Sequence, residues 1–123
     1  MTEESLAFIN TELTSVEIPY EFMEWTSKMV YPYFVGEYTE PEPVNEDGMQ
    51  ESSFMITGTT DGSWLDLEKA KAKIEKLFSN RTVILPNGNG LAVLYSGSLV
   101  VPTGNSRMKR IQINLSIQEW KVN

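Results

Sequence analysis

The chain has 123 residues, of which 41% are hydrophobic, and this length suits one domain with a single hydrophobic core. It contains no histidine and no cysteine, which excludes disulfide bonds, thiolate nucleophiles, the usual zinc ligands and the most common general base. Its net charge of −7 is unevenly divided, because residues 1–60 hold twelve acidic residues and one lysine, whereas residues 61–123 hold five acidic and nine basic residues.

The chain begins with an amphipathic segment. Leu6, Ile9 and Leu13 recur at helical spacing, and acidic residues occupy the first turn, where the helix dipole favours them. These features predict a helix that begins at Thr2 or Glu3 and ends at Thr14. Residues 16–25 have mixed periodicity and predict a turn with a short strand. The opening residues are acidic and no run approaches the roughly 18 apolar residues that span a bilayer. We therefore expect a soluble protein made inside the cell, without a membrane partner.

The next part of the chain predicts two strands separated by a loop. Residues 29–38 are β-rich, and Pro32 restricts this segment to a sheet edge, a strand start or a bulge. Residues 39–50 combine two prolines with acidic residues and a turn signal, which predicts a mobile acidic loop. A strand is expected over residues 51–57.

The second half opens with the clearer of the two helices. Ser63 is a suitable N-cap, and Asp66 stands where a capping box has Glu or Gln, so the helix is predicted to begin at Trp64. Asn80 is expected to end it. The apolar stripe of this helix consists of Leu67, Ala70, Ile74, Leu77 and Phe78.

A hairpin is predicted after this helix. Residues 81–85 and 91–95 are β-rich, and the paired Asn-Gly signals at residues 87–90 reverse the chain between them. A second turn is expected at residues 103–106.

The last strand has the most regular pattern in the sequence. From Lys109 onward, apolar and polar residues alternate, which predicts a strand with one core face and one polar face. The core face has Ile111, Ile113, Leu115 and Ile117; the polar face has Gln112, Asn114, Ser116 and Gln118. A solvated sheet face explains these uncharged side chains, and a surface covered in an assembly also does. Trp120 is an exposed or interfacial aromatic candidate.

The element order predicts an α+β fold over residues 1–123, with two helices packed on a mainly antiparallel sheet that includes a β-hairpin, in a single domain. No repeat or internal domain boundary is visible in the sequence.

Candidate chemistry is sparse. The acidic loop could bind a divalent cation, but it lacks the ligand spacing of an EF-hand, and a solvated loop is the favoured interpretation. The basic cluster at residues 107–110 is short, lacks interleaved aromatics and belongs to a chain with a pI of about 4.6, which argues against nucleic-acid recognition. No carboxylate pair is singled out for catalysis. We expect no enzyme activity, no metal and no cofactor.

The succession of elements resembles a known family. The relevant segments are residues 29–38, an acidic loop with prolines, residues 54–58, the helix that begins at Trp64, and residues 109–117. Over residues 29–120 this pattern is similar to the small tail-completion proteins of long-tailed bacteriophages, particularly the tail terminator family. The resemblance implies an α+β fold and a ring, typically of six copies. Such rings cap the tail tube, stop its growth and face the head connector.

The resemblance thus implies a structural protein of the virion tail that is assembled in the bacterial host cytoplasm. Its implied partners are other copies of this chain, the tail-tube protein and the head connector protein. A ring uses contacts between two different patches, which surfaces of opposite charge suit. The candidate interface residues are acidic Glu40, Glu42, Glu46 and Asp47, basic Lys69, Lys73, Arg107, Lys109 and Arg110, and aromatic Trp120. A solvated acidic half is an equally simple explanation of the charge pattern. The alternative function is a monomeric acidic module that binds and masks a basic surface, as an inhibitor does.

Overall fold

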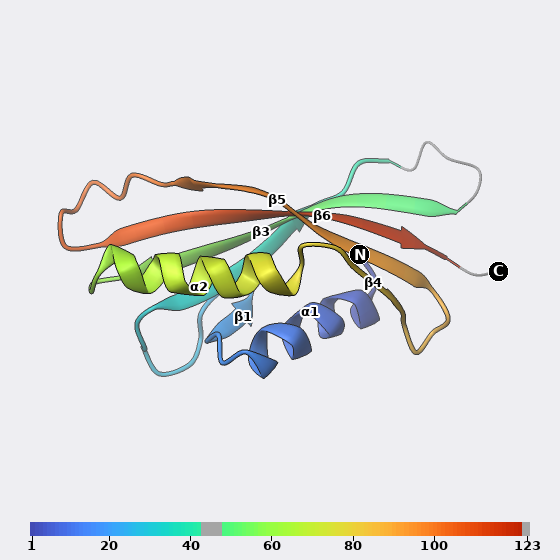
Figure 1. The fold of residues 1–123 in the computed structure, drawn as a ribbon, viewed down its shortest axis with the longest axis horizontal. Coiled ribbons are helices and arrows are strands. Elements are labelled where there is room, and N and C mark those ends of the chain that lie inside the picture. The colour runs from blue at the N-terminus through green and yellow to red at the C-terminus, as the bar shows by residue number, and fades with distance from the viewer. Residues whose placement is uncertain (43–47, 122–123) are drawn as a thin grey trace.

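Six strands form one sheet in the order β1-β2-β3-β6-β5-β4 in the computed structural model, which describes residues 1–42 and 48–121. Two helices cover one face of this sheet (Figure 1). The predicted α+β class is confirmed. The elements are α1 (Glu3–Ser15), β1 (Tyr20–Phe22), β2 (Tyr33–Thr39), β3 (Met49–Thr60), α2 (Trp64–Leu77), β4 (Arg81–Ile84), β5 (Gly90–Val100) and β6 (Lys109–Trp120).

Strand pairing is antiparallel except at one edge, where β1 runs parallel to β2. The central pair is β3 and β6, which stay in register from Met49 opposite Trp120 to Thr60 opposite Lys109. Twelve residues at about 3.3 Å each make this pair roughly 40 Å long. The long strands therefore give the molecule its elongated shape (Figure 1).

Helix α1 begins and packs as its sequence predicts. Thr2 is its N-cap, and the Thr2 hydroxyl accepts a hydrogen bond from the Ser5 N–H at 3.2 Å. Ile9 and Leu13 on this helix are fully buried in the core. Its apolar side therefore rests on the sheet.

Helix α2 begins at the predicted cap and ends earlier than predicted. The Ser63 hydroxyl accepts from the Leu65 N–H at 3.0 Å. The helix ends at Leu77 instead of continuing toward Asn80, because the next residue, Phe78, is fully buried and its carbonyl accepts from the Tyr95 N–H of β5 at 2.8 Å. This bond to the sheet takes the Phe78 carbonyl away from the helical hydrogen-bond pattern.

The alternation predicted for the last strand is confirmed. Its odd-numbered apolar residues are buried against the helices, while its even-numbered polar residues are half-buried on the opposite face. The core joins this strand to both helices and to β2, β3 and β5 through Ile9, Leu13, Phe34, Phe54, Ile56, Leu67, Ile74, Leu91, Val93, Ile113 and Leu115. No element of the described chain covers the other side of the sheet, which we call the open face.

The two halves of the sequence occupy the two halves of the sheet. Strands β1, β2 and β3 come from the acidic half, and β6, β5 and β4 come from the basic half, so they meet at the central β3–β6 pair. The helix layer joins the two halves: α1 packs on β1 and forms an ion pair to β4 between Glu12 and Arg81 at 3.1 Å, whereas α2 packs on β3 and β6. The charge separation of the sequence is thus kept in the sheet and mixed in the helix layer.

Candidate interaction surface

The open face is poor in charge at its centre. Paired directly across β3 and β6 are Ser53 with Ser116, Met55 with Asn114, and Thr57 with Gln112. None of these six side chains is ionisable. Charges on this side of the sheet lie toward its margins, at Glu21, Glu37, Glu51 and Arg110. Uncharged polar groups can be covered by a partner at a lower desolvation cost than charges.

An apolar row crosses one end of the open face. Ile84 on β4, Gly90 on β5 and Trp120 on β6 are register neighbours, and Met49 on β3 follows. Ile84 exposes 76% of its surface and Trp120 exposes 38%. A Cβ on Gly90 would lie 3.8 Å from Cε3 of Trp120, so the indole lies beside this glycine. Trp120, an interface candidate from the sequence, therefore belongs to a small apolar patch.

The predicted basic cluster is divided between two sides of the sheet. Arg107 is exposed in the β5–β6 connection, and Lys109 at the start of β6 faces the helix side. Arg110 lies on the open face, where its Nε donates to the Thr59 hydroxyl at 3.2 Å. Next to Arg110 is a shallow hollow of about 230 Å³ that Tyr33 and Glu37 also line.

The predicted lysines lie on the exposed side of α2, away from the basic cluster. Lys73 donates to the Val16 carbonyl at 3.4 Å, at the C-terminal end of α1. Lys69 lines a hollow with Tyr31 and Asp66, between α2 and the segment before β2. The structure therefore places Lys69 and Lys73 in the helix layer, whereas Arg110 of the basic cluster lies on the open face.

The acidic loop is described only in part. The Glu40 carboxylate forms an ion pair with the Met1 amino group and accepts from the Ser52 hydroxyl at 3.3 Å. Glu42 is exposed. Glu46 and Asp47 lie outside the described residues. Of the two acidic interface candidates that the structure describes, Glu42 is exposed, whereas Glu40 is paired with Met1 within the chain.

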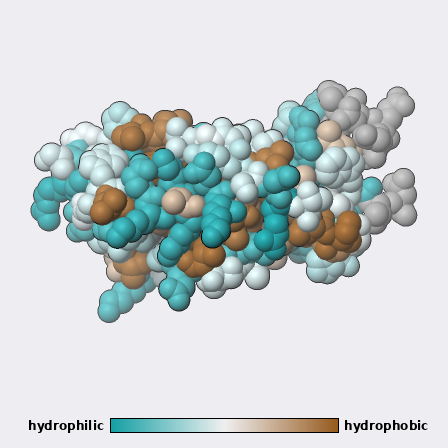
Figure 2. All heavy atoms as spheres, in the orientation of Figure 1, coloured by the Kyte–Doolittle hydropathy of each residue, from teal (hydrophilic) through white to brown (hydrophobic). Residues whose placement is uncertain are grey.

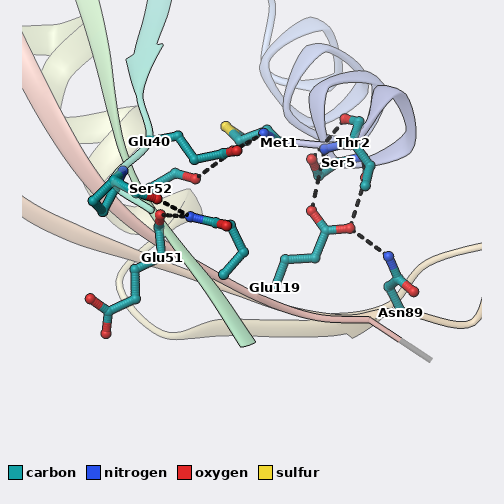
Figure 3. A network of polar contacts seen from close by, with 10 residues as sticks. Met1, Thr2, Ser5, Glu40, Glu51, Ser52, Asn89 and Glu119 are labelled. Atoms are coloured by element: carbon teal, nitrogen blue, oxygen red, sulfur yellow. Dashed lines mark hydrogen bonds and ion pairs between the residues drawn. The ribbon is translucent and has the colours of Figure 1, made fainter. Parts of the chain in front are cut away.

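A buried carboxylate that the sequence analysis did not single out joins three distant parts of the chain (Figure 3). Glu119 exposes 2% of its surface and accepts from the Thr2 hydroxyl at 2.8 Å and from the Asn89 amide at 2.7 Å. Burial alone would raise the pKa of Glu119, but hydrogen bonds from Asn89, Thr2 and Ser5 outweigh this effect and hold its pKa below the ordinary value. The sequence contains a signal for the burial of Glu119, because this residue continues the core-facing alternation of β6.

Large apolar side chains are exposed between β1 and β2, and the sequence analysis did not identify this feature. Their chemistry was visible as a run of methionines and aromatics without periodicity. We call this group the loop surface; it consists of Phe22, Met23, Met29, Val30 and Tyr31, which expose between 40% and 59% of their areas. Figure 2 shows that hydrophobic residues reach the surface at this end of the molecule. Exposed apolar side chains that form a large contiguous patch mark contact sites.

The described residues contain no group of three or more acidic side chains arranged to hold a metal ion. No described helix is long and apolar enough to cross a membrane.

A surface hollow of about 490 Å³ lies between α1 and α2. Lys73, Lys76 and Arg81 surround it, and Val16 and Leu77 are among its lining residues.

No family model matches this sequence, and no curated protein matches it. A solved structure, of a protein whose name describes no activity, aligns with a TM-score of 0.64 at 14% identity and covers 98% of this chain and 89% of that chain. At this identity the similarity shows a shared α+β fold.

Proposed function

We propose that this protein is a structural component of a long bacteriophage tail. In this proposal, copies associate into a closed ring, typically of six, which terminates the tail tube and docks it to the head connector. The proposal rests on the sequence resemblance over residues 29–120, whose element order the fold reproduces. A ring also requires that each copy has a surface that can contact the next copy.

The observation that carries the proposal is the division of charge across the sheet. The strands on one side have Glu21, Glu37 and Glu51 and no basic residue. The strands on the other side have Arg81, Lys109 and Arg110, and their acidic residue, Glu119, is buried. A contact between unlike sides of neighbouring copies is heterologous, and heterologous contacts generate a ring when the rotation between neighbours closes. Opposite charge on the two sides favours that arrangement over contacts between like sides.

The open face supports contact with a second kind of partner. Strands β2, β3, β6 and β5 have 7 to 12 residues each and are spaced about 4.8 Å apart, so they offer roughly 670 Å² of sheet face. A stable interface uses about this area on each partner. In a ring, the sides of the sheet meet neighbouring copies, and the open face remains available to the tail tube or the connector.

Two measurements test the proposal. Light scattering over a concentration series should show a closed oligomer of defined mass, and electron micrographs should show tail tubes of uniform length capped by added protein. A protein that stays monomeric at every concentration and leaves tail tubes uncapped would overturn the proposal.

The alternative, a monomeric acidic module that masks a basic partner, is favoured by the exposed acids of the first half, including Glu3, Glu24 and Glu42. This function predicts a monomer that forms a complex of equal stoichiometry with a basic protein, with an affinity that falls steeply as salt increases. Mass measurement therefore separates the two functions.

A further inference from the structure

The loop surface is held in place by hydrogen bonds within its own segment. The Glu21 carboxylate accepts from the Thr26 hydroxyl at 2.7 Å, from the Thr26 N–H at 3.2 Å and from the Ser27 N–H at 3.2 Å. The Thr26 and Ser27 hydrogen bonds hold the pKa of Glu21 below its ordinary value against a weaker effect of desolvation. Trp25 packs on Tyr33 with ring centroids 5.4 Å apart. An apolar surface fixed in advance loses less entropy when it binds.

A second apolar surface lies where α2 begins beside the β5–β6 connection. We call it the hairpin hollow; it has a volume of about 350 Å³, and its apolar lining consists of Trp64, Val100, Val101, Pro102 and Met108. Trp64 and Val100 are exposed. Lys109 also lines the hollow, and exposed Arg107 follows Ser106 at its rim.

The two segments that supply most of these side chains differ in charge. Residues 21–31 have Glu21 and Glu24 against Lys28, and Lys69 lies beside Tyr31. Residues 100–109 have Arg107 and Lys109 and no acidic residue, whereas Asp61 and Asp66 flank Trp64. Apolar centres with charged rims of opposite sign are the arrangement found in specific interfaces.

The positions of the loop surface and the hairpin hollow allow a contact between two neighbouring copies. Figure 1 shows the β5–β6 connection and the segment between β1 and β2 toward the same end of the long axis, on opposite sides of the molecule. A rotation about an axis parallel to the long strands therefore brings the loop surface of one copy beside the hairpin hollow of another, without a shift along the strands.

We infer that the loop surface of one copy packs into the hairpin hollow of a second copy of this chain. This inference rests on the proposed self-association and names the contact that closes the ring. The exposed methionines and Tyr31 fill the hollow, and Glu24 of one copy approaches Arg107 of the other.

Disulfide trapping tests the contact directly, because the chain has no native cysteine. Two variants, Met29→Cys and Ser106→Cys, are mixed in equal amounts under mild oxidation. The expected product is a mixed dimer with little of either homodimer. The matched control is Ser79→Cys, which is exposed at the end of α2 and should not cross-link to Met29→Cys. Homodimers of Met29→Cys alone would show that like surfaces meet and would overturn the inference.

A charge exchange provides a second test. Glu24→Arg and Arg107→Glu should each weaken self-association about tenfold, and an equal mixture of the two should recover it, because the mixed contact again joins opposite charges. Glu75→Arg on the exposed side of α2 is the control for added charge. Thermal unfolding checks that each variant folds.

The outcomes separate this inference from the function. Rings that form normally with both charge variants, and without the mixed disulfide, would disprove this contact and leave the proposed function standing. A chain that never self-associates would disprove both. Loss of tail-tube capping by Glu24→Arg with self-association unchanged would assign the loop surface to the tail tube and overturn the inference.

Discussion

Glu119 on β6 accepts a hydrogen bond from the hydroxyl of Thr2, the N-cap residue of α1, although 117 positions separate them in the sequence. The same hydroxyl accepts from the Ser5 N–H, so it serves the helix cap and the carboxylate at once. The amide of Asn89 completes the group from the β4–β5 turn. This arrangement fixes the start of α1 to the C-terminal end of β6, one of the two central strands.

Glu119→Gln should destabilise the fold by about 1–3 kcal/mol at neutral pH, because an amide cannot accept hydrogen bonds at both positions and has no charge. The folded-state pKa of Glu119 lies below its ordinary value of about 4.3. The carboxylate therefore contributes stability above that pH, and this contribution is lost as the pH falls through the folded-state pKa.

Urea unfolding from pH 7 to pH 3 measures this effect. The difference between wild type and Glu119→Gln should shrink as the pH falls. Glu75→Gln, at an exposed position on α2, should behave like the wild type. An equal difference at all pH values would show that the charge of Glu119 is unimportant.

Gly58→Ala should destabilise the protein by about 1–3 kcal/mol through overpacking. Gly58 lies opposite the fully buried Phe34, and a Cβ there would come within 2.2 Å of the Phe34 ring. Gly90→Ala is the matched control, since its Cβ would make an ordinary contact at 3.8 Å. Thermal unfolding of Gly58→Ala alone and together with Phe34→Leu should give non-additive effects, because the smaller side chain leaves room for the methyl group.

Asn114→Lys places a charge at the centre of the open face, where the residue directly opposite on β3 is the uncharged Met55. The side chain is half-buried and can extend into solvent in the isolated chain, so stability should change by less than about 0.5 kcal/mol. Capping of tail tubes should be lost, because the charge would be buried without a partner. Ser79→Lys adds the same charge at an exposed site outside this face and should still cap.

Replacing both Lys69 and Lys73 by Glu should preserve the fold, since both side chains are exposed on α2. If the lysines attract acidic residues of a neighbouring copy, association should slow, and the defect should be largest at low salt, where charges are least screened. Stopped-flow light scattering across a salt series measures this rate. Equal rates for variant and wild type at every salt concentration would assign these lysines to solubility alone.

Much of the fold could be predicted because its elements follow local patterns. The alternation of β6 and the Ser63 cap of α2 depend on neighbours in sequence, and both are confirmed. The parallel pairing of β1 with β2 and the early end of α2 at Phe78 depend on contacts with distant strands, which no local pattern specifies.

The candidate surface was less predictable for a related reason. Sequence identifies which residues are charged but not which face each one occupies: Lys69 and Lys73 lie in the helix layer, whereas Arg110 lies on the open face. The loop surface could not be predicted from sequence, because only the structure shows that the apolar side chains of the segment after β1 lie outside the core. The exposure of Trp120, by contrast, followed from its place on the polar side of β6, as expected.

The position of β6 between β3 and β5 has a consequence for the synthesis of the protein. The strands made earlier, β1 to β3 on one side and β4 with β5 on the other, have no direct pairing to each other and are joined by a strand that ends at Trp120. Until β6 has been made, the nascent chain holds two half-sheets that have no strand pairing with each other. Pairing of the two half-sheets therefore waits for β6 and depends on non-local contacts, which slow folding.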